Sequence, residues 1–145
     1  MKINIYIKSS VKTLKRQNGV VGFVIEAEAF EGYTITQFGS VRDVTDNQSQ
    51  LLALKYALMR INDKSELIIW TDNKYIAAAF NQGWIKGWKY RGWKTAKGKD
   101  VANSEEWKEV LELLKDNIPQ FKIQENHSYS TWLHREVERR AKKYV

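Results

Sequence analysis

The sequence contains no cysteine, which excludes disulfide bridges and thiolate metal sites. It has a single proline, Pro119, and no run of apolar residues long enough for a signal peptide or a membrane span. Internal repeats, low-complexity tracts and linkers are also missing. A length of 145 residues with 43% hydrophobic content suffices for one core. We therefore expect residues 1–145 to form one compact, soluble, cytoplasmic domain.

Acidic residues are outnumbered, with 17 Asp and Glu against 24 Lys and Arg. The excess is concentrated in residues 84–102, called the handle below, where Asp100 is the single anion. Its six cations are Lys86, Lys89, Arg91, Lys94, Lys97 and Lys99, and they alternate with the rings of Trp84, Trp88 and Trp93. Cations that neutralise phosphates, interleaved with rings that stack on bases or sugars, predict a nucleic-acid-binding surface.

A competing interpretation of the handle is a Trp-rich core helix with lysines that extend to solvent. Gly87, Gly92 and Gly98 argue against it, because glycines at this interval interrupt a helix. We expect a short helix, a turn and a protruding loop.

Hydrophobic periodicity predicts five strands and several helices. The expected strands are residues 3–7, 20–25, 33–38, 65–71 and 120–124. The expected helices run from Thr45 or Asp46 to Ile61, over 73–82, from 103 to about 114, and over 131–144, and Pro119 is expected in the connection before the last strand. The order βββαβα…αβα predicts an α/β (α+β) fold with a mixed sheet: antiparallel hairpins on one side and parallel crossovers on the other.

Several motifs together resemble type 1 ribonuclease H, which cuts the RNA strand of RNA/DNA hybrids. The most specific is W84-I-x-x-W-K-x-R-G-W-K-T-A96, followed by V101-x-N-x-x-x-W107, which resembles the basic protrusion of the bacterial enzymes. T71-D-N-K-Y75 is similar to the family motif at the end of the fourth strand, and residues 45–51 match the segment that opens the first helix. The resemblance implies a five-stranded ribonuclease H-like sheet with helices on both faces. It adds Asn47 and Lys74 to the residues expected to bind nucleic acid.

The resemblance also implies two-metal phosphodiester hydrolysis, in which four carboxylates hold two magnesium ions. Only Asp72 is retained at these positions, while Lys8, Gln50 and Glu138 stand at the other three. Because magnesium requires several hard, negatively charged oxygen ligands, we expect no metal cofactor and no efficient cleavage. Lys8 is predicted to replace the metal as a counter-ion between Asp72 and Glu138. The leading interpretation is a non-catalytic domain that binds RNA/DNA hybrid or another duplex through the handle.

The sequence is also compatible with two alternatives. One is a divergent nuclease that uses Asp72 and Glu138 with a single Mg²⁺ or Mn²⁺, assisted by His127, which stands where the family has a mobile histidine. The other is a protein-interaction module that docks on a nucleoprotein partner. Asp72 could also simply cap the helix that follows it.

Overall fold

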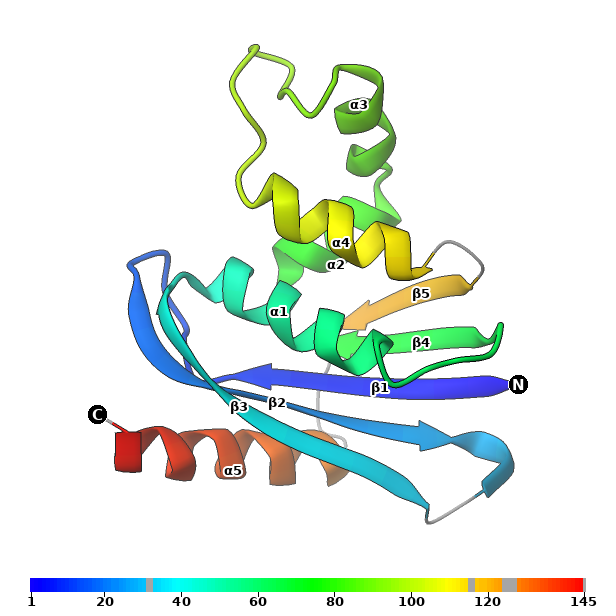
Figure 1. The fold of residues 1–145 in the computed structure, drawn as a ribbon, viewed down its shortest axis with the longest axis vertical. Helices are drawn as coiled ribbons and strands as arrows, with labels where there is room; N and C mark the ends of the chain where they lie inside the picture. The colour runs from blue at the N-terminus through cyan, green and yellow to red at the C-terminus, as the bar shows by residue number, and fades with distance from the viewer. Residues whose placement is uncertain (31–32, 115–116, 124–127, 145) are drawn as a thin grey trace.

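The computed structural model describes residues 1–30, 33–114, 117–123 and 128–144 (Figure 1). The five strands are β1 Lys2–Ser9, β2 Gln17–Ala27, β3 Thr34–Val44, β4 Glu66–Thr71 and β5 Ile118–Ile123. A short 3-10 helix spans Glu28–Phe30, and the α-helices are α1 Asp46–Leu58, α2 Lys74–Asn81, α3 Trp84–Tyr90, α4 Ser104–Leu114 and α5 Ser128–Tyr144. In the described part of the chain, no helix is long and apolar enough to cross a membrane.

The strands form one mixed sheet in the order β3-β2-β1-β4-β5. Strand β2 pairs antiparallel with β1 and β3, and β4 pairs parallel with β1 and β5. This confirms the predicted division into hairpins on one side and crossovers on the other. The sheet is expected to be mixed because β1 to β3 follow one another through short connections, whereas β4 and β5 are each preceded by helices.

Helices cover both faces of the sheet (Figure 1). Helix α1 packs on β1 and β2 from one side, and α5 packs on the same strands from the other. The core between α1 and the sheet contains the fully buried side chains of Ile5, Ile7, Leu54 and Ile69. A smaller cluster under α5 joins Tyr6, Val24 and Leu133. The alternating side chains of β1 thus supply both layers, as the two-residue period of a strand requires.

Strands β2 and β3 are longer than the predicted ranges 20–25 and 33–38, and two further predictions need correction. Helix α1 ends at Leu58 rather than Ile61, although Ile61 still packs against the core. Pro119 lies inside β5, opposite Leu67, rather than in the connection. Proline lacks a backbone N–H, but β5 is an edge strand, where a missing donor is tolerated.

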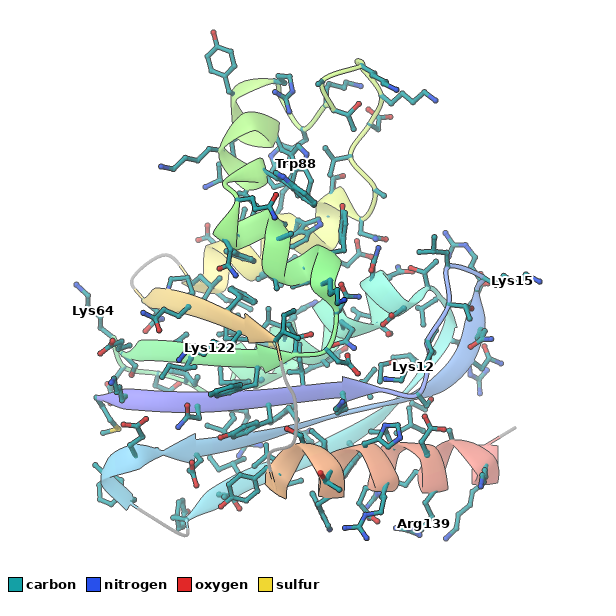
Figure 2. All side chains as sticks on the ribbon, turned by 180° about the vertical axis from the view of Figure 1, so that it is seen from behind. Lys12, Lys15, Lys64, Trp88, Lys122 and Arg139 are labelled. Carbon is teal, nitrogen blue, oxygen red and sulfur yellow. The ribbon has the colours of Figure 1, made fainter. Side chains whose placement is uncertain are left out.

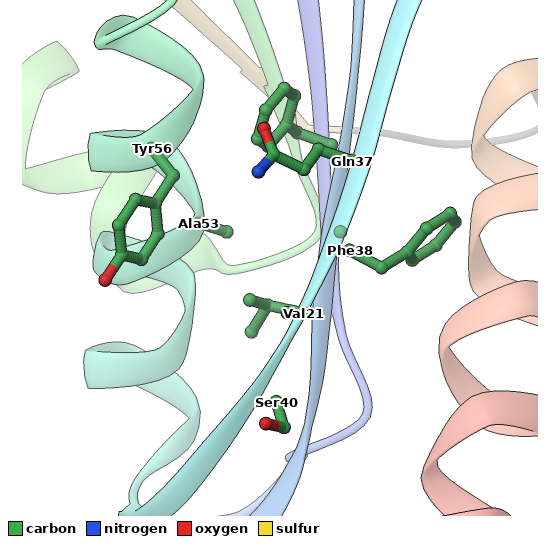
Figure 3. Close-up of a pocket in the computed structure, with 9 residues that line it drawn as sticks. Val21, Gln37, Phe38, Ser40, Ala53 and Tyr56 are labelled. Carbon is green, nitrogen blue, oxygen red and sulfur yellow. The ribbon is translucent and has the colours of Figure 1, made fainter.

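A shallow pocket of about 180 Å³ lies between α1 and strands β2 and β3 (Figure 3). Its lining includes Val21 and Phe38 from the strands and Ala53 and Tyr56 from the helix. No residue of this lining carries a charge at neutral pH. Ligand pockets typically enclose about 300–1,000 Å³, so this pocket is smaller than a typical ligand site.

Candidate nucleic-acid interface and degenerate metal centre

Lys8 and Asp72 meet at the carboxyl ends of two parallel strands. The last paired residues of β1 and β4 are Tyr6 and Trp70, and Lys8 and Asp72 follow each of them by two positions. Because side chains two apart share a face, the ammonium and the carboxylate are brought together. Lys8 Nζ donates a hydrogen bond to Asp72 Oδ2 over 3.0 Å. The predicted pairing of Lys8 with Asp72 is therefore present in the structure.

Asp72 accepts two further hydrogen bonds. Lys12, in the loop after β1, also donates to Oδ2, with its Nζ at 3.1 Å. Gln50 Nε2 donates to Oδ1 over 2.9 Å. The Asp72 side chain is 30% exposed and the Lys8 side chain 11% exposed. Burial by itself would raise the pKa of the Asp72 carboxyl, but Lys12 and Lys8 together hold that pKa below its ordinary value.

Gln50 has a fixed orientation because both ends of its amide are hydrogen-bonded. The side chain is fully buried in α1. Its Oε1 accepts a hydrogen bond from the Thr71 hydroxyl over 3.1 Å, while its amide nitrogen faces Asp72. A buried amide is stable only when its donors and acceptors are paired. Gln50 is therefore a neutral donor to Asp72, whereas a carboxylate there would repel it.

Asp72 does not cap the helix that follows it. The cap of α2 is Asn73, whose Oδ1 accepts from the backbone N–H of Ile76 over 2.9 Å. The side-chain amide of Asn73 donates to Asn47 Oδ1 over 2.8 Å. Asn47 thus lies beside the site, half-buried, and Lys74, the first residue of α2, is exposed. The capping interpretation of Asp72 was wrong, because the neighbouring residue has that role.

Asp46 is a second carboxylate at the site. The sequence predicted it only as a possible cap of the helix that begins there. Thr45 is the actual cap of α1, since its hydroxyl accepts from the Gln48 backbone N–H over 3.2 Å. Burial raises the pKa of the Asp46 carboxyl; Lys12 lowers it, and the negative charge of Asp72 raises it further. Its Oδ1 is buried with no hydrogen-bond partner among the described residues. Asp46 precedes Gln50 by four positions, one helical turn, and that spacing could have indicated its place.

Glu138 does not complete the expected arrangement. It lies in α5, half-buried. Within the described residues, none of the ion pairs includes Glu138, and Lys8 pairs with Asp72 alone. The prediction that Lys8 bridges two carboxylates is thus corrected: the second partner of Asp72 is a second ammonium, that of Lys12. His127, the other predicted remnant, lies outside the described residues.

The handle protrudes from the body of the protein beyond α2 and α4 (Figure 1). Its short helix, α3, ends at Tyr90, and Lys94 then bridges to Asp100 across a tight loop. Backbone hydrogen bonds from Trp93 N to Trp88 O, 2.6 Å, and from Val101 N to Trp93 O, 3.0 Å, connect this loop to the helix. The predicted sequence of short helix, turn and loop is present.

Trp88 was predicted to stack on nucleic acid, and this prediction needs correction. The residue is 7% exposed and points into the base of the handle (Figure 2). Its ring lies 5.6 Å from that of Trp107 and 6.3 Å from that of Tyr75, measured between centroids. Trp93 is half-buried against Trp88, at 6.2 Å, and Trp84 is the more accessible indole. The competing interpretation, a Trp-rich core, therefore describes Trp88 correctly.

The cations of the handle lie on its surface. Lys86, Lys89, Arg91, Lys94, Lys97 and Lys99 are all exposed. Lys94 forms a salt bridge with Asp100, and Arg91 Nε donates to the Lys94 carbonyl over 3.0 Å. Tyr90, which was not among the predicted binding residues, is 91% exposed at the end of α3. A phenol ring among exposed cations can stack on a base or sugar.

The chain is similar in sequence and in fold to known proteins of one family. A family model described as RNase H matches residues 2–138. The chain belongs to the RNase H family. Ribonuclease H of Syntrophomonas wolfei is 33% identical over 95 residues, which cover 65% of this chain and 65% of that protein. Ribonuclease H of Thermus thermophilus is 33% identical over 84 residues, covering 58% and 51% respectively. The matches thus span about half to two thirds of the length of these curated relatives.

Solved RNase H structures share the fold. LC9-RNase H1, described as a type 1 RNase H with the type 2 active-site motif, superposes with a TM-score of 0.76 at 17% identity, covering 99% of this chain and 74% of that one. The foamy viral protease-reverse transcriptase in complex with RNA/DNA hybrid superposes with a TM-score of 0.71 at 16% identity, covering 98% and 20%. At these identities the likeness establishes the ribonuclease H-like fold.

The donor set of this RNase H-like centre does not fit a pair of magnesium ions. In residues 1–30, 33–114, 117–123 and 128–144, no group of three Asp, Glu, His or Cys side chains could hold a metal. Two carboxylates, Asp72 and Asp46, are accompanied by the ammonium groups of Lys8 and Lys12. A cation approaching Asp72 would meet two ammonium groups at Oδ2 and the Gln50 amide donor at Oδ1.

Lys8→Met should destabilise the fold by about 1–2 kcal/mol at neutral pH, because Asp72 would lose its more buried counter-ion. The folded-state pKa of Asp72 is lowered, so its pairing stabilises the fold above its ordinary pKa of 3.8, and this contribution is lost as the pH falls through the lower folded value. Urea unfolding at pH 7 and pH 3 should show a difference that shrinks in acid. Lys15→Met, on the same loop, should have no such effect. An equal loss at both pH values would instead indicate lost packing.

Trp88→Ala should reduce the free energy of unfolding by about 3–5 kcal/mol, because it empties the centre of the aromatic cluster. Tyr90→Ala, at an exposed position two residues away, should leave the stability unchanged. Thermal or urea denaturation of the two variants makes the comparison. Equal stabilities would contradict the buried position of Trp88.

Proposed function

We propose that this chain is an RNase H-like domain that binds RNA/DNA hybrid, or another nucleic-acid duplex, without cleaving it efficiently. The observation that carries the proposal is the compensation of Asp72 by Lys8 and Lys12. The ammonium groups of Lys8 and Lys12 contact Asp72, the one carboxylate that matches the family pattern. They oppose the binding of a divalent ion by electrostatic repulsion, which is strong in a half-buried site.

Binding is supported by the handle, whose six exposed cations lie on one protruding element. Lysine and arginine side chains bind duplexes by displacing condensed counter-ions from phosphates, so affinity depends on salt. The protrusion is anchored by buried aromatic rings, including Trp88 and Trp107. An anchored element loses little conformational freedom on binding. The geometry therefore favours a preformed binding surface.

The unmodified protein should not cleave RNA/DNA hybrid above background with magnesium or manganese. Lys8→Asp, Lys12→Ser and Gln50→Glu together should recover some metal-dependent cleavage, because they restore two carboxylates beside Asp72 and remove both ammonium groups. Labelled hybrid resolved on denaturing gels provides the measurement. Gln50→Glu alone is the control and should remain inactive, since both lysines stay in place.

Cleavage by the unmodified protein that requires a divalent ion and disappears in Asp72→Asn would overturn the proposal. That result would favour a divergent nuclease. Binding without cleavage would leave the proposal standing.

Lys89→Gln with Lys97→Gln should weaken hybrid binding and reduce the slope of log K against log salt by about 1.8, from about 0.9 for each lost phosphate contact. Lys2→Gln with Lys64→Gln is the matched control, because it removes the same charge from exposed positions outside the handle: Lys2 begins β1, and Lys64 lies away from the handle in Figure 2. Fluorescence anisotropy of labelled hybrid at several salt concentrations gives both slopes. Indistinguishable slopes for the two double variants would mean that the handle does not bind the ligand.

A further inference from the structure

The ammonium groups of Lys8 and Lys12 have more N–H donors than their hydrogen bonds to Asp72 require. Each ammonium carries three N–H donors. Within the described residues, the recorded hydrogen bonds of Lys8 Nζ and Lys12 Nζ go to Asp72 Oδ2 alone, at 3.0 and 3.1 Å. Spare donors at the edge of a half-buried site are suited to an anion that approaches from outside.

The two lysines differ in access to solvent. The Lys8 side chain is 11% exposed, and that of Lys12 is 38% exposed. Lys8 is therefore placed as an internal counter-ion to Asp72. Lys12 lies at the surface, so an external anion can contact its ammonium while the bond to Asp72 persists.

The loop that carries Lys12 is fixed on both sides of this residue. Before it, Val11 is fully buried and its backbone N–H donates to Ser9 Oγ over 3.0 Å. After it, the Thr13 carbonyl accepts from the Asp46 backbone N–H over 2.9 Å. The ammonium of Lys12 is thus positioned by the fold and by Asp72, in contrast to that of a lysine on an unanchored loop.

We propose that Lys12, anchored by Asp72, binds a phosphate of the nucleic-acid backbone at the end of β1 and β4. In this arrangement an ammonium bridges a carboxylate and a phosphate oxygen, which is the bridging role of a metal ion in a two-metal centre. The inference rests on the proposed nucleic-acid binding and deepens it by assigning a contact at the degenerate centre. A lysine ammonium neutralises a phosphate but does not generate a nucleophile from water, so this contact binds without hydrolysis.

The charges around Lys12 are compatible with a phosphate. Asp72 and Asp46 lie close to it and, when ionised, balance the two ammonium groups. The site therefore carries no net negative charge that would repel the ligand. Lys74, exposed at the start of α2 next to Asn73, adds a further cation on this side of the molecule.

The test measures binding of a labelled RNA/DNA hybrid by anisotropy in EDTA. Lys12→Gln should weaken binding about tenfold near 0.1 M salt and reduce the salt slope by about 0.9, as the loss of one phosphate contact requires. Lys15→Gln is the matched control, because it removes the same charge from an exposed position on the same loop. Lys12→Arg, which keeps a cation there, should retain the slope.

A second measurement locates the contact. Hybrids with one neutral methylphosphonate linkage, moved stepwise along each strand, should reveal a position at which the parent and Lys15→Gln lose affinity. Lys12→Gln should lose no further affinity at that position, because the contact is already absent.

The outcomes distinguish the two proposals. If the parent binds hybrid in EDTA but Lys12→Gln behaves like Lys15→Gln, the phosphate contact is refuted and the proposed function stands. If the parent binds only with a divalent ion, the bridging role of Lys12 is refuted. If the parent binds no duplex under any condition, both proposals fail.

Discussion

The half-buried negative charge of Asp72 is the constraint on which the rest of the site depends. A carboxylate removed from water must be paired or protonated. Here it is paired by two ammonium groups and one amide. In a two-metal centre the same charge would be balanced by divalent ions, held by several carboxylates. Lys8 and Gln50 are therefore consistent with one another, because each donates a hydrogen bond to the same carboxylate.

The parallel pairing of β1 with β4 brings the ammonium of Lys8 to the carboxylate of Asp72. The register continues two residues beyond the last paired residues to Lys8 and Asp72, so the side chain of residue 8 contributes, with Lys12, to the charge around Asp72. The buried amide of Gln50 extends the arrangement to Thr71, whose hydroxyl also accepts from the Asn73 backbone. A network in which each polar group has a partner is stable as a unit, whereas a partly paired one is costly. A single substitution toward the family pattern would leave some of these groups unpaired.

Much of the fold could be predicted from the sequence because it follows from local periodicity. The apolar alternation of β1 and the continuous apolar run of β4 predict one mixed sheet, and the ends of these strands predict that Lys8 meets Asp72. Lys12 could not be placed, since the course of its loop depends on hydrogen bonds to residues distant in sequence, such as Asp46. The burial of Trp88 was not predicted, because rings at helical spacing occur both in cores and on binding surfaces. The contact between Trp88 and Trp107, which lies in the next helix, shows that Trp88 belongs to the core.

Lysine side chains have different surroundings in the handle and at the ends of β1 and β4. The handle lysines are exposed, so each proposed phosphate contact there would contribute little and several would have to act together. At the centre, the exposed Lys12 ammonium is held by its hydrogen bond to Asp72, so the proposed phosphate contact there would require less ordering of the side chain. A duplex that contacts both would be oriented by the centre and retained by the handle. If both proposals hold, the centre positions a backbone phosphate without supplying the ligand set that two-metal hydrolysis requires.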